Sequence, residues 1–455
     1  PGKLTLTANS QATQKLDNSE GQISAQQLNI RVGELVNDHG AIEQTGTGVK
    51  QALIESAGNL NNTSGSIIAN AQDFTLNAGA LNNTSGLIGH AGTGKLTLSA
   101  TSLNNSQGQI MGNGAASIYT SGDITNADGL ISVAAHLSIQ SADLSNTVSG
   151  TSQSATGIQS QSGNLSLNTA ALTNSGSIYA AQDVSTTAKS LNNSGSLYAG
   201  GAQTLTVTEA LHTSGTIAAA KDLTIQAQNL SGTSTNVLAA GMAADGQLSG
   251  TGTLTVNTSG ALQSAGQVLA TNGLGLTGSA LNLAGSQTGT TAGDVNLTAS
   301  SGDINTRQAQ VSTPGQLSIT ANSQSTQKLD NTEGQISAQQ LNIRVGQLVN
   351  DHGAIEQTGI GVQTASINTL GSLNNTSGRI VANAQDFTLN TGALTNNIGL
   401  IGHAGTGLLQ VDSISLDNTQ GKITGNGTAQ IITSDNTTNA SGLISAQQNM
   451  TLSAG

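Results

Sequence analysis

A short sequence unit is repeated along the whole length of this chain and limits the folds that it can adopt. Stretches of the form Leu-x-Asn-x-x-Gly-x-Ile recur at intervals that are mostly 19–22 residues. Counting the weaker matches gives twenty starts between residues 16 and 437, or about 22 residues per unit. Such short periods are typical of solenoids, in which one unit buries its apolar face only by stacking on its neighbours.

A longer repeat contains the short one. Residues 14–46 recur as 327–359 with two changes in 33, and residues 60–94 recur as 373–407 with six changes in 35. The offset of 313 residues equals 14 short units. We interpret residues 1–142 and 314–455 as duplicate copies within one continuous shaft that covers residues 1–455.

Each unit has the pattern of strands and turns. In residues 60–81 the apolar side chains alternate, as in Phe74-Thr-Leu76, over runs of three to five residues. This two-residue period indicates a strand with one buried face. Gly, Asn, Ser and Asp separate the runs, as tight turns require. No segment keeps a 3.6-residue apolar period for three turns, so we expect almost no helix.

Three short strands per unit cannot bury their own inner faces, but stacked coils can. The sequence therefore predicts an all-β, right-handed parallel β-helix of about 20–21 coils, each of about 22 residues and three short strands. Asparagines at one repeated turn position can form amide ladders along such a stack. We assign this structural turn and ladder role to Asn18, Asn37, Asn62, Asn83, Asn105, Asn146, Asn174, Asn193, Asn331, Asn350, Asn375, Asn396 and Asn418.

The composition supports a solenoid against several globular domains. Only 36 of the 455 residues are charged and five are aromatic, while 58 are glycine. Globular cores depend on aromatic side chains, and charged residues usually make up about a quarter of a soluble domain. An apolar fraction of 35% argues against disorder. A narrow interior of small aliphatic side chains, with turns of Asn and Gly, accounts for this composition.

Composition also excludes several classes of partner and site. With 12 Lys and Arg and a net charge of −12, the chain offers no basic surface for nucleic acid. No apolar run reaches the length of a membrane span, and no signal peptide is visible. Because the chain starts at Pro1, we expect it to be a piece of a larger protein. The absence of cysteine excludes disulfides and thiolate metal sites.

Five intervals are longer than the rest. Three are 25 residues, one is 28 and one is 32. The two longest contain Thr147–Gly163 and Thr233–Gly250, which are rich in Ser, Gly, Thr and Ala. Extra residues in a solenoid form loops on the outside. These insertions are either tolerated surface loops or loops that contact a ligand or receptor.

The polar residues give little support for an enzyme or a metal site. Asp and Glu are spread thinly, and Asp123 and Asp128 are the nearest approach to the paired carboxylates of a carbohydrate-active β-helix. We assign them to turns. Six histidines are present, and four of them are copies related by 313 residues, so we expect turn or surface positions rather than a metal site. We predict no catalytic residues, cofactor or metal.

At this point the repeats can be compared with a known family. The runs at Leu60–Ala69, Leu172–Ala180 and Leu191–Ala199 resemble the haemagglutinin repeats of filamentous haemagglutinin-like exoproteins of Gram-negative bacteria. This family includes large adhesins and the toxins of contact-dependent growth inhibition. The resemblance implies two-partner secretion through an outer-membrane transporter and a secreted or cell-surface location. The absence of cysteine is consistent with that route.

Three functions are open at this stage. The first is a rigid stalk that presents a distal adhesive or toxin module to target cells. The second is an adhesin that binds a target-cell receptor, a host surface or a glycan through the rod face or the insertion loops. The third is a carbohydrate-active β-helix enzyme. For the isolated piece we also expect end-to-end association, or fraying at residues 1–15 and 440–455, because cut solenoids expose strand edges.

Overall fold

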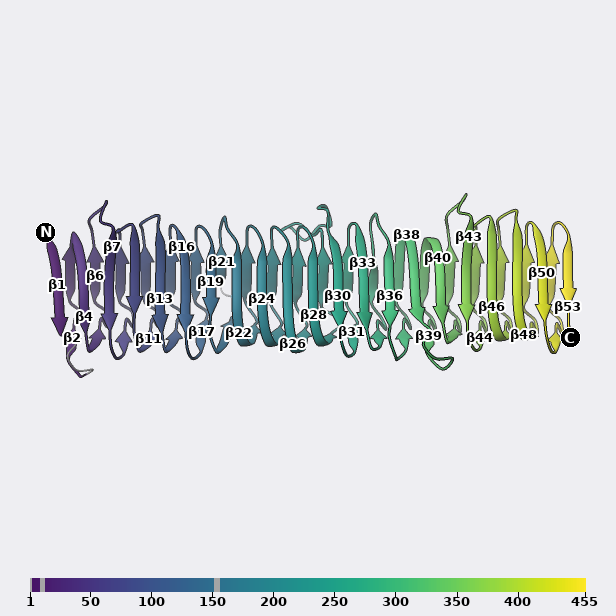
Figure 1. The fold of residues 1–455 in the computed structure, drawn as a ribbon, viewed down its shortest axis with the longest axis horizontal. Coiled ribbons are helices and arrows are strands. Elements are labelled where there is room, and N and C mark those ends of the chain that lie inside the picture. Colours follow the sequence, from purple (N-terminus) through teal and green to yellow (C-terminus); the bar gives the residue numbers. More distant parts are fainter. Residues whose placement is uncertain (1, 9–12, 151–155) are drawn as a thin grey trace. The chain divides into compact units, whose positions relative to one another are not determined.

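The chain folds into parallel strands stacked in coils (Figure 1). The computed structural model describes residues 2–8, 13–150 and 156–455, and these contain strands and turns but no helix. The coils form a β-solenoid of about 21 turns with about 21 residues per coil. This confirms the predicted fold class. The strands form two compact units, Pro1–Ala220 and Lys221–Gly455, which are described separately.

The first unit has three faces, each a stack of parallel strands. Face A contains β1 (Lys3–Ala8), β4 (Gln27–Val32), β7 (Gln51–Ser56), β10 (Asp73–Asn77), β13 (Lys95–Ala100), β16 (Ala115–Thr120) and β19 (Leu137–Gln140). Face B contains β2 (Lys15–Asp17), β5 (Glu34–Val36), β8 (Leu60–Asn61), β11 (Ala80–Asn82), β14 (Ser102–Asn104), β17 (Ile124–Ala127) and β20 (Asp143–Thr147). Face C contains β3 (Gln22–Ala25), β6 (Ala41–Gln44), β9 (Ser66–Ala69), β12 (Leu87–His90), β15 (Gln109–Gly112), β18 (Leu130–Val133) and β21 (Gly157–Ser160).

The later coils of this unit join faces A and B. One long strand there replaces two short ones, because the corner between them stays extended. The joined strands are β22 (Leu165–Asn174), β24 (Val184–Asn193) and β26 (Gln203–Thr213). Face C continues as β23 (Ser177–Ala180), β25 (Ser196–Ala199) and β27 (Thr216–Ala219).

The second unit repeats this arrangement. Face A contains β30 (Thr253–Thr258), β33 (Gly273–Gly278), β36 (Val295–Ala299), β43 (Thr364–Thr369), β50 (Thr428–Thr433) and β53 (Met450–Ser453). Face B contains β31 (Leu262–Ser264), β34 (Leu281–Asn282), β37 (Ile304–Asn305), β39 (Lys328–Asp330), β41 (Gln347–Val349), β44 (Leu373–Asn374) and β51 (Thr437–Thr438). Face C contains β29 (Val237–Ala240), β32 (Gln267–Ala270), β35 (Gln287–Thr290), β42 (Ala354–Gln357), β45 (Arg379–Ala382), β47 (Leu400–His403), β49 (Lys422–Gly425) and β52 (Leu443–Ala446).

Some strands of the second unit also run through a corner. Faces A and B are joined in β28 (Leu223–Gly232), β46 (Asp386–Thr395) and β48 (Leu408–Asp417), and faces C and A in β38 (Gln310–Ala321) and β40 (Gln335–Val345).

The core of each unit is built by stacking like side chains in register. Along face B, Leu81 pairs with Leu60 on one side and Leu103 on the other. Along face A, Leu76 lies between Ile54 and Leu98. All six side chains are buried. Because burying one such side chain contributes about 1.5–3 kcal/mol, the repeated interior rows dominate the stability of the stack.

The extra residues of the 25-residue intervals form outward loops. The loops at 45–50 and 358–363 follow β6 and β42, and Figure 1 shows them projecting beyond the strands near β7 and β43. A buried glutamine holds each loop. In the first copy, Gln44 Nε2 donates to the carbonyls of Gln26 (2.6 Å) and Gly46 (2.7 Å), and Gln357 makes the equivalent bonds.

The structure describes the two longest insertions to different extents. Part of the first, residues 151–155, lies outside the described residues. In the second, Val237–Ala240 is a regular strand of face C, and the extra residues begin after it. Met242 and Leu248 form an isolated antiparallel bridge, and Gly250 N donates to Gly241 O at 2.9 Å. The loop at 241–250 is therefore a small hairpin whose ends are adjacent.

Candidate functional site

Asparagines at the corner between faces B and C, all buried except Asn439, form one continuous feature in each unit, which we call the asparagine ladder. The Nδ2 group of each asparagine donates to Oδ1 of the asparagine in the next coil, at 2.7–2.8 Å. In the first unit the members are Asn18, Asn37, Asn62, Asn83, Asn105, Asn126, Asn146, Asn174 and Asn193. In the second they are Asn331, Asn350, Asn375, Asn396, Asn418 and Asn439.

The structure thus brings all thirteen predicted asparagines into the two ladders and adds two more. Asn126 and Asn439 follow the weaker starts at Ile124 and Thr437 by the same two residues. Relaxing the leucine requirement while keeping that spacing would have found both. Hydroxyls replace the amide at two ladder ends. Asn193 Nδ2 donates to Thr213 Oγ1 at 3.3 Å, and Thr306 Oγ1 donates to Asn331 Oδ1 at 3.0 Å.

At twelve of the fifteen ladder asparagines the turn depends on a glycine three residues later, whereas a serine stands there after Asn146, Asn174 and Asn193. A Cβ added to Gly65 would lie 2.0 Å from Asn37 O of the preceding coil. The residue before this glycine takes a left-handed backbone, as with His39 (φ 52°) and Ser64 (φ 50°). Asparagine Nδ2 is also within hydrogen-bonding distance of the glycine carbonyl, 3.3 Å for Asn62. Each side-chain amide therefore forms hydrogen bonds within its own turn and with the next coil, and it does not provide a reactive group.

The carboxylates predicted to lie in turns accept hydrogen bonds from backbone and hydroxyl groups. Asp128 accepts from the hydroxyl and the backbone NH of Ser149, and Asp123 Oδ1 accepts from Asp143 N at 3.2 Å. The Ser149 hydroxyl holds the pKa of Asp128 below its ordinary value. A lowered pKa favours the charged acceptor form, whereas a general acid needs a raised one.

Aspartates on the outer side of face B have lowered pKa values for related reasons. The Ser19 hydroxyl, followed by Lys15, lowers the pKa of Asp17 to about 2. For Asp330, burial opposes the charged form most strongly, but the hydroxyl and NH of Thr332 together with two cations still lower the pKa. These side chains close two-residue turns of the Asx type.

Two of the six histidines contradict the expectation of turn or surface positions. His90 and His403 are each only 2% exposed and point into the interior. The Nε2 group of His90 lies 3.0 Å from Ala71 O, and its ring is 6.3 Å from that of Phe74. His403 repeats both contacts with Ala384 and Phe387. The error arose because His90 follows an apolar run directly before a glycine-rich turn, so the sequence pattern matched either location.

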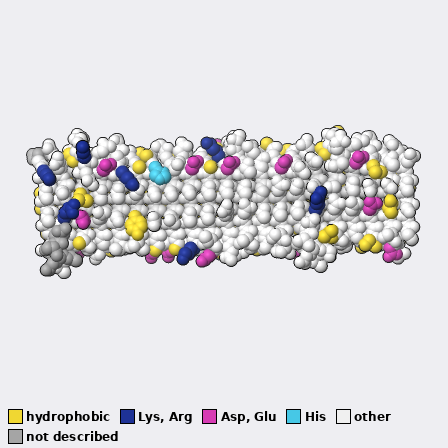
Figure 2. Space-filling view, in the orientation of Figure 1, with side chains coloured by type: hydrophobic (Ala, Val, Ile, Leu, Met, Phe, Trp, Pro, Cys, Tyr) yellow, Lys and Arg dark blue, Asp and Glu magenta, His cyan; other side chains and the backbone are white. Residues whose placement is uncertain are grey.

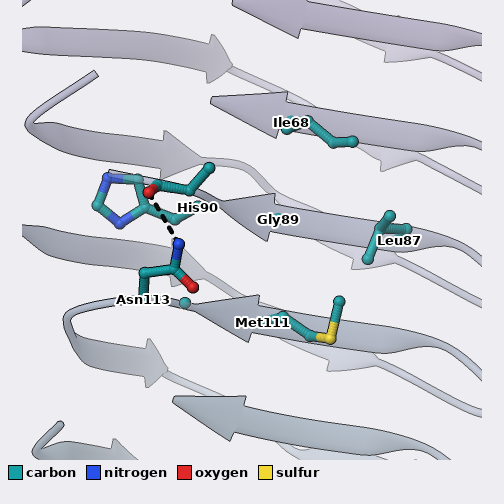
Figure 3. A pocket seen from close by; sticks show the side chains of 8 residues that line it. Ile68, Leu87, Gly89, His90, Met111 and Asn113 are labelled. Atoms are coloured by element: carbon teal, nitrogen blue, oxygen red, sulfur yellow. Dashed lines mark hydrogen bonds between the residues drawn. The ribbon is translucent and has the colours of Figure 1, made fainter. Parts of the chain in front are cut away.

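A shallow apolar groove lies outside His90 (Figure 3). Leu87, Ile68 and Met111 surround Gly89, whose missing side chain leaves the depression. Asn113 Nδ2 donates to Ala91 O at 2.9 Å beside it. The volume of the groove is about 180 Å³.

The outer surface carries few charges, and these are dispersed. Figure 2 shows charged side chains scattered singly over the visible face. Within the described residues, no three His, Cys, Asp or Glu side chains are grouped to hold a metal ion. That same part of the chain includes no helix capable of crossing a membrane.

The repeats of this chain match a protein-family model and a curated relative. The model of the haemagglutinin repeat family matches residues 2–64, 49–94, 230–299, 282–340 and 315–371, which together cover just over half of the chain. A curated relative, Toxin CdiA of Yersinia pestis, is 39% identical over 126 residues. The match covers 28% of this chain and 4% of that relative, so the chain spans a small fraction of its length. No solved structure matches.

Proposed function

The chain belongs to the haemagglutinin-repeat family, and from this premise we propose that it is part of the shaft of a secreted exoprotein of a Gram-negative bacterium. Its work is mechanical: it holds a distal adhesive or toxin module away from the producing cell. An outer-membrane transporter of the two-partner type is its partner during export.

The observation that carries this proposal is the in-register stacking within each unit. The coils repeat the same three faces and interior rows, and most of them also repeat the ladder amide, so they add length without adding a reactive centre. In a solenoid each coil contacts only its neighbours. Such a structure suits a spacer, and we propose that it has no catalytic activity.

The internal duplication offers a direct test of a function based on length. Deleting residues 18–330 joins Asp17 to Asn331, which are followed and preceded by the same sequence in the two copies. In a chimera with a binding module after residue 455, we expect the deletion to keep surface display and module binding. The distance from the cell surface, measured by electron microscopy, should fall by about 14 coils at roughly 4.8 Å each.

The control is a deletion that is about half a coil longer and therefore out of register. Deleting residues 28–340 also removes 313 residues and is in register, whereas deleting residues 18–340 removes half a coil more and should prevent secretion of a folded chain. If the in-register deletion abolished module binding although the chain was folded and displayed, the passive-shaft proposal would fail. Export that continued without the transporter would separately contradict the proposed route.

A second candidate function rests on the hairpin at 241–250. Its hydrogen-bonded ends and its own bridge make it a defined protrusion that could contact a receptor or glycan. Since Gly241 and Gly250 are adjacent, removing residues 242–249 should leave the pairing of β28 with β30 intact. Loss of binding to target cells by this variant, with the fold retained, would favour the adhesin over the shaft.

The enzyme alternative is tested by assaying the chain against acidic polysaccharides with and without Ca²⁺. We expect no turnover. Turnover that disappeared in Asp123→Asn would overturn the proposal that the chain is not an enzyme.

A further inference from the structure

The chain has four arginines, and three of them form ion pairs with carboxylates. Arg31 Nη1 lies 3.0 Å from Glu55, Arg307 Nη1 lies 3.3 Å from Asp330, and Arg379 Nε lies 2.7 Å from Glu356. The fourth, Arg344, forms no ion pair or side-chain hydrogen bond with any residue that the structure describes. It is exposed on face A of the second unit.

The two copies show why Arg344 lacks a partner. Arg31 and Arg344 occupy the same position, and each is in register with one residue of the next strand on face A. That residue is Glu55 in the first copy and Asn368 in the second. The substitution replaces a carboxylate with an amide and leaves the guanidinium without its acid. The next acid along this row is Asp412, three strands from Arg344.

The amide of Asn368 contributes a donor instead of an acceptor. Asn368 Oδ1 accepts a hydrogen bond from Asn390 Nδ2 at 2.9 Å. Its Nδ2 group donates to no described residue. The acid of the first copy is thus replaced by an amide whose acceptor is occupied, so both groups present donors.

A cavity of about 310 Å³ lies at this place, lined by Asn322, Arg344, Val345, Asn368, Thr369 and Leu370. This volume suits a small organic molecule.

One wall of this cavity comes from the loop at 322–327. The loop is fixed by Gln327, which is only 3% exposed. Gln327 Oε1 accepts from Ser323 Oγ (2.5 Å) and Gln324 N (3.1 Å), and its Nε2 donates to Gly302 O (3.0 Å). Asn322 therefore stands at the base of a braced loop.

The lining also includes an aliphatic side chain that is larger in the second copy than in the first. Leu370, whose equivalent in the first copy is Ala57, is 59% exposed. The cavity therefore combines a guanidinium, two amide side chains and an aliphatic side chain. A guanidinium recognises a carboxylate through two parallel hydrogen bonds.

We propose that this cavity, the Arg344 pocket, binds a small organic carboxylate whose acid group takes the place that Glu55 fills in the first copy. The carboxylate pairs with Arg344 and accepts from the amides, and the body of the ligand packs on Leu370. This site is independent of the shaft function, because ligand binding here needs only one coil and its neighbours.

The experiment uses the full chain labelled with ¹⁵N at arginine Nε, which gives four side-chain signals. Titration with glucuronate and with acetyl-aspartate amide at low ionic strength should shift the Arg344 signal, with affinities of about millimolar for one solvent-accessible guanidinium. The signals of Arg31, Arg307 and Arg379 should not move, because carboxylates already occupy them. Tighter binding of one probe identifies the sugar acid or the peptide acid as the source of the carboxylate.

Two variants of the Arg344 pocket and one variant at the equivalent position of the first copy test the proposal. Asn368→Glu restores the ion pair of the first copy and should weaken binding at least about tenfold, as should Arg344→Gln when binding is followed on the signals of the probe itself. Glu55→Asn should make the Arg31 signal sensitive to the same probes. The proposal is overturned if Arg344 does not respond, if glucose shifts it as much as glucuronate, if inorganic phosphate binds more tightly than both carboxylates, or if Asn368→Glu binds unchanged.

Discussion

The two copies of the long repeat, residues 1–142 and 314–455, differ in a selective way. Over the aligned segments 14–46 and 60–94, eight positions change, and not one of the eight is buried in the first copy. The ladder asparagines, the turn glycines and the interior rows are identical there. Charges on the outside have instead been exchanged: the Arg31–Glu55 pair is lost, and an Arg379–Glu356 pair is formed.

This difference teaches that neighbouring coils fix the inner residues, while the outer residues are constrained only by their own turn. An interior side chain contacts its equivalents in the coils above and below, so one substitution affects the packing of three coils. An exposed change such as Ser85 to Ile398 affects one turn. The predictions below test this distinction, beginning with the largest expected effect.

The turn glycines should be the most sensitive positions. A Cβ at Gly65 or Gly378 would lie 2.0 Å from the asparagine carbonyl of the coil before it. We expect Gly65→Ala and Gly378→Ala each to destabilise the local coils by about 3 kcal/mol or more, because backbone atoms would have to move. Hydrogen exchange of the peptides around each site measures the effect in its own copy.

Gly89→Ala is the matched control. An added Cβ there meets Ile68 Cγ1 at an ordinary 3.5 Å and fills the surface groove, so exchange should change little. Equal protection in Gly89→Ala and Gly65→Ala would contradict the role given to the close approach of the coils.

Replacing the ladder asparagines should have the next largest effect on stability. Asn83→Ala removes two ladder bonds and leaves Asn62 Nδ2 and Asn105 Oδ1 without their partners inside the stack. We expect a loss of about 2–3 kcal/mol, since buried polar groups lose their hydrogen bonds. Asn396→Ala should cost the same in the second copy. Urea titration with exchange as a local probe reports the loss.

The neighbouring outer asparagine provides the control. Asn82 is replaced by Thr395 in the second copy, so Asn82→Thr should cost less than about 1 kcal/mol. If Asn83→Ala lost no more stability than Asn82→Thr, the asparagine ladder would not contribute to the stability of the fold.

A smaller effect, of opposite sign, is expected at Ile398. This β-branched residue has φ of 58° and is 63% exposed, whereas its counterpart Ser85 has the same backbone without the branched side chain. Ile398→Ser should stabilise its turn by about 1 kcal/mol, because β-branched residues are strained in the left-handed region. Ser85→Ile should destabilise by a similar amount. A stability change of the same sign in both variants would refute the strain argument.

The smallest effect concerns pH. The pKa of Asp330 is lowered in the folded chain, so the charged form contributes stability that is complete above the unfolded value of about 4 and is lost as pH falls through the folded pKa. For Asp17 the loss extends down to about pH 2. Asp330→Asn should flatten this acid dependence in urea titrations.

The contribution of Asp17 to stability should be weaker than that of Asp330, although its pKa is lowered to about 2. Its side chain is 52% exposed, against 10% for Asp330, and Asp330 lies near both Arg307 and Lys328. Salt should therefore reduce the effect of Asp17→Asn more than that of Asp330→Asn. Identical acid profiles for the two variants would show that burial makes no difference.

The sequence alone determined the fold class and the position of the ladder. A period of about 22 residues with alternating apolar side chains leaves stacking as the one way to bury the interior, and stacking forces equivalent residues into register. Predictions that depended on local repetition, such as Asn62, Asn83 and Asn105, could therefore be made residue by residue.

The contacts between side chains of neighbouring coils became known from the three-dimensional structure alone. The sequence could not place His90 inside, reveal the hairpin at 241–250, or show that Arg344 faces Asn368 where Arg31 faces Glu55. The His90 and arginine contacts join residues 19 to 24 positions apart, across corners and loops of variable length. Periodicity fixes the stacking of equivalent residues, but the direction and pairing of an individual side chain depend on the space that its neighbouring coils leave.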